Sequence, residues 1–206
     1  MAKSSIVVIS GPAGSGKGTI VKKLLTDTEN YAVSVSTTSR APRGDDTPGV
    51  TYNFVTREKF EDMIARGELA EYAEYVGNYY GTPIDGVQHL LSSGKNVILE
   101  IETHGALQIK AKFPDAILIW LCPPDYHTLC ERLRSRGTNT EEDIAKRLTT
   151  ARRELQLINY YDYIVVNHSG KADEAAQEVR DIVNAHRHAV RNNPEFIREF
   201  YRNDVE

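Results

Sequence analysis

Cysteine, tryptophan and long hydrophobic runs are scarce in this chain of 206 residues. Its two cysteines, Cys122 and Cys130, are too few for a disulfide framework, so we expect reduced, buried thiols. No apolar run approaches the roughly 18 residues that span a membrane. The first apolar run begins within a few residues of the N-terminus, so we expect no secretory signal. These absences together predict a cytoplasmic protein that does not bind membranes.

An excess of positive charge is also absent. The chain has 25 Lys and Arg against 29 Asp and Glu, a formal charge of −4, which argues against a dedicated nucleic-acid-binding protein. Its six histidines show no metal-ligand spacing, and we expect His186 and His188, on a late helix, to be solvated. A hydrophobic content of 40% is sufficient for the core of one globular domain, and the chain shows no internal repeats.

Near-continuous apolar runs alternate with segments of helical character. Such runs are typical of strands buried on both faces of a parallel sheet, so the sequence predicts an α/β fold with a five-stranded parallel sheet flanked by helices. The expected strands cover residues 6–9, 31–36, 97–99, 116–122 and 163–166. The expected helices cover residues 19–25, 125–134, 141–160 and 172–190, the third with Ile144, Leu148, Ala151, Leu155 and Ile158 on one face.

Residues 36–90 do not follow this alternation and predict a small mixed α+β insertion. Residues 40–49 are rich in proline and glycine and should form a loop. A short strand is expected at 52–55, followed by a helix that Thr56 caps and that ends near Ala65. We expect an alternating strand at 68–75, a turn at Gly77-Asn78 and a helix at 85–91.

Residues 10–19 read Ser-Gly-Pro-Ala-Gly-Ser-Gly-Lys-Gly-Thr and lie between the first strand and the first helix. This order is typical of a P-loop, in which glycines let successive backbone N–H groups face a phosphate and the lysine adds a mobile charge. We therefore expect a polyphosphate, most simply ATP, on the residues from Gly11 to Thr19: Gly11, Pro12, Ala13, Gly14, Ser15, Gly16, Lys17, Gly18 and Thr19.

One position departs from the P-loop consensus. Gly18 follows the lysine, where a serine or threonine commonly binds Mg²⁺, and the hydroxyl comes one residue later, at Thr19. Since Mg²⁺ keeps several waters in most sites, it could be held through water and the nucleotide, near Thr19 and Glu100.

Four further groups of residues have both a functional and a plain structural reading. Arg40 and Arg43 could form a fork for a phosphate or could be solvated surface charges. The tyrosines of segment 78–82 could stack on a ligand or only pack together. Glu100 and Glu102, at the end of a buried strand, could face a ligand or solvent. Around Gly137, arginines could form a lid over a phosphoryl group or a solubilising helix surface: Arg132, Arg134, Arg136, Arg147, Arg152 and Arg153.

The ordered set of these motifs resembles the guanylate kinase family, from Ile6 to about His186. The resemblance implies transfer of a phosphoryl group from Mg·ATP to GMP, and also to dGMP. It implies that the GMP phosphate contacts Arg40, Arg43, Tyr52 and Tyr80, and that the guanine faces Ser36, Glu71, Thr82 and Glu102. It further places Glu100 in the GMP site, near Mg²⁺ and the transferring phosphate. It places Asn167 beside the ATP base and the catalytic charges on Lys17, Arg136 and Arg147.

The resemblance also implies a division of the chain into a core, a GMP-binding insertion and a lid. The core would comprise residues 1–35, 91–135 and 150–206, the insertion residues 36–90 and the lid residues 136–149. The expected partners are ATP and GMP, with a homodimer left open. Two alternatives stay open as well: another nucleoside monophosphate kinase such as adenylate kinase, and a non-catalytic scaffold module.

Overall fold

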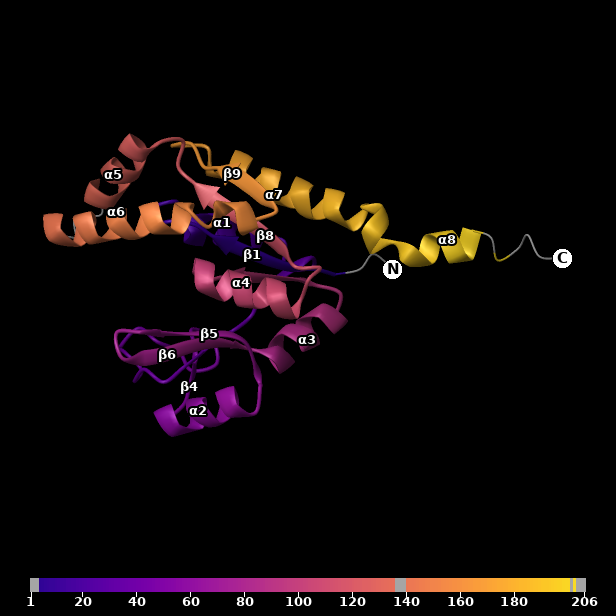
Figure 1. Ribbon diagram of the computed structural model, residues 1–206, viewed down its shortest axis with the longest axis horizontal. Coiled ribbons are helices and arrows are strands. Elements are labelled where there is room, and N and C mark those ends of the chain that lie inside the picture. The colour runs from indigo at the N-terminus through magenta and orange to yellow at the C-terminus, as the bar shows by residue number, and fades with distance from the viewer. Residues whose placement is uncertain (1–3, 136–139, 201, 203–206) are drawn as a thin grey trace.

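A five-stranded parallel sheet forms the centre of the computed structural model, which describes residues 4–135, 140–200 and 202 (Figure 1). The strands lie in the order β2-β7-β1-β8-β9, and all neighbours are parallel. Their bounds are β1 Ile6–Ser10, β2 Tyr31–Val33, β7 Asn96–Glu100, β8 Ile117–Cys122 and β9 Tyr163–Val166. The α/β class and the five parallel strands expected from the sequence are confirmed.

Helices cover both faces of this sheet. Helices α1 (Lys17–Leu24) and α7 (Ala172–Arg187) pack on the face that carries Val7 and Ile9. Helices α3 (Ile84–Ser92) and α4 (Thr103–Lys112) pack on the face that carries Ile6 and Val8. Successive residues of β1 therefore enter different cores, which explains why the strand is apolar throughout. Each such side chain contributes about 1.5–3 kcal/mol on burial.

The insertion has a sheet of its own, in the order β4-β3-β6-β5. Helix α2 (Arg57–Ala65) buries Phe60 and Met63 against it, and Thr56 caps this helix by accepting a hydrogen bond from the Lys59 N–H. The strands are β3 Thr37–Thr38, β4 Asn53–Phe54, β5 Leu69–Tyr75 and β6 Asn78–Pro83. The turn expected at Gly77-Asn78 lies one residue earlier, at Val76-Gly77, because the tyrosines after it extend as β6 alongside β5.

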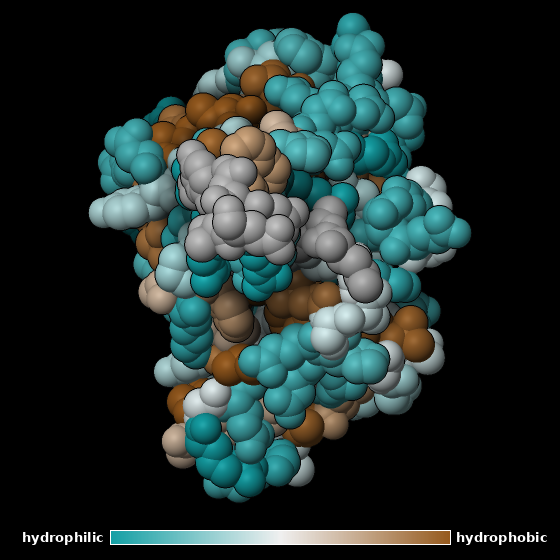
Figure 2. Space-filling view, turned by 90° about the vertical axis from the view of Figure 1, so that its right-hand side faces the viewer, coloured by the Kyte–Doolittle hydropathy of each residue, from teal (hydrophilic) through white to brown (hydrophobic). Residues whose placement is uncertain are grey.

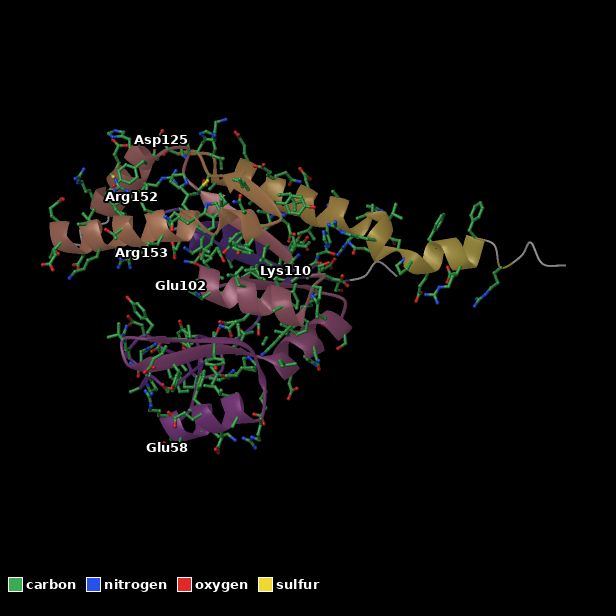
Figure 3. The ribbon with its side chains drawn as sticks, in the orientation of Figure 1. Glu58, Glu102, Lys110, Asp125, Arg152 and Arg153 are labelled. Carbon is green, nitrogen blue, oxygen red and sulfur yellow. The ribbon has the colours of Figure 1, made fainter. Side chains whose placement is uncertain are left out.

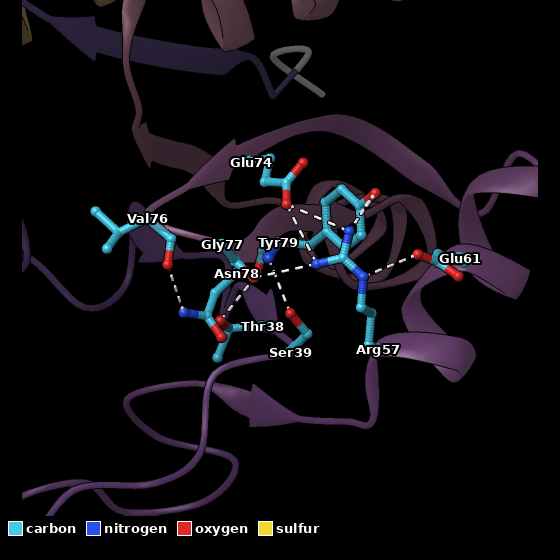
Figure 4. Close-up of polar contacts among 9 residues, drawn as sticks. All are labelled: Thr38, Ser39, Arg57, Glu61, Glu74, Val76, Gly77, Asn78 and Tyr79. Carbon is cyan, nitrogen blue, oxygen red and sulfur yellow. Dashed lines mark hydrogen bonds and ion pairs between the residues drawn. The ribbon is translucent and has the colours of Figure 1, made fainter.

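Side chains from α2 and β3 hold the β5–β6 hairpin (Figure 4). Arg57 of α2 forms an ion pair with Glu74 of β5 at 3.2 Å, and its guanidinium lies 4.4 Å from the centre of the Tyr79 ring. Thr38 donates from Oγ1 to the Tyr79 carbonyl at 2.8 Å, and the Tyr79 N–H donates to Ser39 Oγ at 2.8 Å. The hairpin is therefore fixed to the rest of the insertion from two sides.

The C-terminal half contains helices α5 Tyr126–Ser135, α6 Glu141–Leu155 and α8 Pro194–Phe200, with short 3-10 helices at Ile158–Tyr160 and Val190–Asn192. The helix expected at 141–160 is wrong in its last turn, since α6 ends at Leu155. Leu155 is also 53% exposed, because the cluster that α5 and α6 bury together ends at Ala151. Helix α8 extends away from the rest of the chain at the right of Figure 1.

The expected solvation of His186 is wrong. His186 is 5% exposed. It lies seven residues after Val179 and three after Val183, a spacing that places it on the same buried face of α7. Burial lowers the pKa of its imidazole. It lines a cavity of about 160 Å³ with Ile6 and Ala116, at the ends of β1 and β8 opposite the P-loop. His188 is exposed, as expected.

Cys122 and Cys130 are half-buried free thiols, and burial raises the pKa of Cys122. The face that carries the chain termini is mainly hydrophilic where its residues are coloured (Figure 2). Within residues 4–135, 140–200 and 202, no helix is both long and apolar enough to cross a bilayer.

Candidate active site

The loop between β1 and α1 has a backbone that only glycine adopts readily. Gly11, Gly14 and Gly16 have φ values of 147°, 94° and 95°, in the left-handed region that other residues avoid. A Cβ on Gly11 would overlap the Leu121 carbonyl of β8, and one on Gly16 would overlap the amide of Asn167. Gly16 is also the N-cap of α1, so the positive end of the helix dipole faces the loop. The loop is therefore built for a phosphate.

Lys17, the first residue of α1, turns its ammonium back across this loop. Nζ donates to the Gly11 carbonyl at 2.6 Å and to the Pro12 carbonyl at 3.3 Å. These carbonyls hold the charge at the mouth of the loop, where a phosphate can compete for it.

Two residues from distant parts of the chain brace the loop. Asn167, just after β9, is 6% exposed and donates from Nδ2 to the Ser15 carbonyl at 2.8 Å. Arg132 of α5 donates to the Asn167 carbonyl at 2.8 Å and reaches the Ser15 carbonyl at 3.5 Å. The sequence does not reveal these contacts, because 35 residues separate Arg132 from Asn167 and 152 residues separate Asn167 from Ser15.

Two cavities meet beside the loop. The first, of about 420 Å³, lies over the P-loop and is lined by Gly14, Gly16, Gly18 and Thr19. The second, of about 870 Å³, lies between the insertion and the core. Both cavities are lined by Lys17 and Glu100. Of the nine residues expected to bind GMP, the structure brings six to the second cavity: Ser36, Tyr52, Glu71, Tyr80, Glu100 and Glu102.

Glu71 of β5 is the most buried carboxyl group of the second cavity, at 5% exposure. Thr82, which lies directly opposite on β6, donates from Oγ1 to Glu71 Oε1 at 2.7 Å. Burial raises the pKa of Glu71, while the Thr82 hydrogen bond and the positive charge of Lys112 act in the opposite direction. A buried carboxylate that still has unpaired acceptor capacity can recognise a ligand with N–H donors.

The two arginines of the 36–43 segment lie outside the lining of the second cavity. Arg40 forms an ion pair with Asp46 at 2.9 Å, and its guanidinium lies 5.5 Å from the centre of the Tyr52 ring. Tyr52 in turn packs edge-on against Tyr80, with ring centres 5.9 Å apart. Arg43 is exposed, and its backbone N–H donates to Asp46 at 2.7 Å. Arg40 therefore lies beside the tyrosines, whereas the Arg43 side chain faces solvent.

Glu100 and Glu102 reach the cavity from different elements. The expectation that both lie on one strand is wrong, because β7 ends at Glu100 and Glu102 is the N-cap of α4. Figure 3 shows Glu102 at the start of α4. A Cβ on Gly18 would lie 3.8 Å from Glu100 Oε2. The residue at which the P-loop differs from the consensus therefore faces the Glu100 carboxylate directly. Across the described residues, no cluster of three or more His, Cys, Asp or Glu side chains could hold a metal ion.

Glu154, near the end of α6, lines neither cavity, but its carboxyl group is electrostatically coupled to residues of the site, which the sequence did not indicate. Its pKa is raised, first by burial and then by the negative charge of Glu102, while Lys17 and His104 lower it. Its only sequence signal is a carboxylate next to the apolar face of a helix.

Arg147 is exposed on α6 and lines neither cavity. Arg136 lies outside the described residues, as do residues 137–139 of the expected lid.

A P-loop on a parallel sheet, joined to a second cavity of nucleotide size, defines a P-loop phosphotransferase. The family model described as guanylate kinase matches residues 3–186. The chain belongs to the guanylate kinase family, and its function is that of an ATP:GMP phosphotransferase.

Individual relatives agree with the family. The chain is 48% identical to a guanylate kinase of Lactococcus lactis over 185 residues, which cover 90% of this chain and 89% of the relative. It is 47% identical to a guanylate kinase of Halalkalibacterium halodurans over 183 residues, 89% of each. The crystal structure of a guanylate kinase from Anaplasma phagocytophilum matches with a TM-score of 0.71 at 31% identity, over 91% of this chain and 88% of that one.

Proposed function

We propose that ATP binds with its phosphates in the P-loop cavity, that GMP binds in the second cavity, and that the γ-phosphoryl passes between them beside Lys17 and Glu100. The observation that carries this assignment is that these two residues line both cavities. An in-line transfer requires the donor and acceptor oxygens to face each other across the transferring group, and only the shared region allows that.

Guanine recognition follows from the acids of the second cavity. The guanine edge presents N1–H and a 2-amino group, and the Glu71 carboxylate can accept from both. Thr82 orients this carboxylate, and Glu102 and Ser36 complete the wall. AMP lacks this pair of donors, so its binding would leave the buried carboxylate without a donor from the ligand.

The GMP phosphate would lie at Tyr52 and Tyr80, with Arg40 and Arg43 as its cationic partners. Arg40 already rests on the Tyr52 ring and would exchange the Asp46 carboxylate for the phosphate. Arg43 would have to turn inward from solvent. A guanidinium suits this role because its planar fork binds a phosphate through two hydrogen bonds.

Charge stabilisation, not proton removal, would carry the chemistry. A phosphate monoester has its second pKa near 6, so at neutral pH the attacking GMP oxygen is mainly anionic and needs no strong base. Lys17, Arg136 and Arg147 would stabilise the negative charge of the transferring group. Glu100 and the Thr19 hydroxyl offer the hard oxygen ligands that Mg²⁺ takes, directly or through water. Mg²⁺ held there would supply positive charge to offset that of the ATP phosphates.

Closure of the site would involve two moving parts, the insertion (residues 36–90) and the lid (residues 136–149), on the core of residues 1–35, 91–135 and 150–206. The second cavity lies between insertion and core, so closing it would expel the water that could hydrolyse ATP. Closure would also bring Arg147 from its exposed position on α6 toward the phosphates. The two free thiols support the reducing cytoplasm as the location of this reaction.

A steady-state comparison of acceptors tests the proposed function. We expect phosphorylation of GMP and dGMP, and a kcat/KM at least about a hundredfold lower for AMP, CMP and UMP, since each leaves a buried acceptor unpaired. Equal rates with AMP and GMP would overturn the guanine assignment. ATP hydrolysis as fast without acceptor as with GMP would overturn the closure.

A further inference from the structure

Strand β5 is the edge of the insertion sheet, yet its outer edge is not left to solvent. Its sheet partner is β6, on one side only. An edge strand ordinarily exposes the N–H and C=O groups of every second residue on its free side. Here α4 of the core lies along that side, as Figure 1 shows.

The Gln108 side chain of α4 takes the place of a neighbouring strand. Its Nε2 donates to the Tyr72 carbonyl at 2.9 Å, and its Oε1 accepts from the Tyr72 N–H at 3.1 Å. One carboxamide thus satisfies both backbone groups of one residue, as a paired strand would. Tyr72 directly follows Glu71, the carboxylate proposed to read the guanine.

Two more residues on the same face of α4 lie against β5 close to Glu71. Lys112, four residues after Gln108, donates from Nζ to the Leu69 carbonyl at 2.5 Å. Gly105, three residues before Gln108, lies so close that a Cβ there would come within 2.6 Å of Glu71 Oε2. The backbone of Glu71 is thereby anchored on both sides, and its carboxyl group rests against the first turn of α4.

We propose that Gln108 is a positioning residue for guanine specificity. By clamping the Tyr72 peptide to α4, it fixes Glu71 of the insertion relative to Glu102, which begins the same helix in the core. The two carboxylates that face the guanine are then linked through the contact between α4 and β5, although 31 positions separate them in the sequence. This inference rests on the proposed guanine-binding role of Glu71.

The test compares GMP with IMP, the same 6-oxopurine nucleotide without the 2-amino group. Gln108→Leu keeps the approximate volume and removes both hydrogen bonds, while Gln108→Glu keeps the acceptor for the Tyr72 N–H and loses the donor. Gln88→Leu, at an exposed position of α3, is the matched control. For each variant, kcat/KM for GMP and for IMP, the KM for ATP and the melting temperature are measured, with Glu71→Gln as the reference for lost recognition.

We expect Gln108→Leu to lower the GMP-to-IMP ratio of kcat/KM by about five- to tenfold, the loss of roughly one well-placed hydrogen bond. Gln108→Glu should recover part of it, Gln88→Leu should match the wild type, and the KM for ATP should change less than twofold. A ratio that stays at the wild-type value in Gln108→Leu but falls in Glu71→Gln would overturn the positioning role alone. A ratio unchanged even in Glu71→Gln would overturn the role of Glu71 and the positioning role with it. A lower melting temperature with an unchanged ratio would leave Gln108 only a structural role and contradict the proposal.

Discussion

The contact between Asn167 and the P-loop gives the sharpest prediction for ATP binding. Asn167→Ala removes the Nδ2 donor from the Ser15 carbonyl, which lies in a residue that is 0% exposed. The remaining approach to that carbonyl, from Arg132 at 3.5 Å, is at the outer limit of a hydrogen bond. A buried acceptor left without its donor costs about 1–3 kcal/mol. If the loop relaxes to recover this, its N–H groups leave the positions that suit a phosphate.

The expected result is a five- to roughly 150-fold rise in the Kd of Mg·ATP, the same energy expressed as an equilibrium ratio. Isothermal titration of the free enzyme measures that Kd, and the KM for GMP at saturating ATP should stay within about twofold because the second cavity is not lined by Asn167. Asn30→Ala is the matched control, since Asn30 is exposed and its Nδ2 donates to the Asp27 carboxylate, away from the P-loop.

A comparison of ATP with GTP as donor separates two roles for Asn167. If its side chain supports the loop, both nucleotides lose affinity together, because both have the same triphosphate. If instead it contacts the base, as the family resemblance implies, the ATP-to-GTP preference changes. An unaltered Kd for ATP in a variant that melts like the wild type would refute the bracing role.

Three further predictions follow from single groups. Gly16→Ala should destabilise the protein by about 1–2 kcal/mol, because alanine is strained in the left-handed conformation of this residue. It should also weaken ATP binding, because the added Cβ would meet the Asn167 amide. Thermal unfolding and ATP titration measure the two effects, and Gly44→Ala, with open space around its Cβ, should show neither. Because burial raises the pKa of Glu71, kcat/KM for GMP should fall as the pH drops through that raised pKa and the carboxylate becomes protonated. In a pH profile, Glu71→Gln should lack this fall at acid pH. A fall that persists in Glu71→Gln would show that the GMP phosphate, and not Glu71, is the group that titrates. Arg43→Ala should raise the KM for GMP at least about tenfold with the KM for ATP unchanged, and GMP kinetics equal to the wild type would refute its part in phosphate binding.

The parts of the fold that could be read from the sequence are those with a local cause. The buried strands are predictable because both of their faces enter a core, as Val7 and Val8 illustrate. The P-loop is predictable because its glycines are required by backbone φ angles, which act within one short segment. The cap of α2 at Thr56 is equally local.

What the sequence could not show depends on contacts between distant segments. Strand β6 exists because β5 and β3 pair with it, and its tyrosines alone suggest a turn as readily. Asn167 braces the P-loop across 152 residues, and Gln108 completes the edge of a strand 36 residues away. Neither amide carries a pattern of its own. The structure thus adds positioning contacts to a site whose residue types were already visible.

The central claim is that the two cavities hold the two nucleotides with their phosphates meeting beside Lys17 and Glu100. A compound in which adenosine and guanosine are joined 5′ to 5′ through a chain of five phosphates tests this most directly. Titration should give a Kd at least about a hundredfold tighter than that of ATP or GMP alone, since the second half binds at the effective concentration set by the linker. In Lys17→Met, that advantage should be largely lost. A linked compound that binds wild-type protein no tighter than its halves would contradict the claim that the cavities form one continuous site.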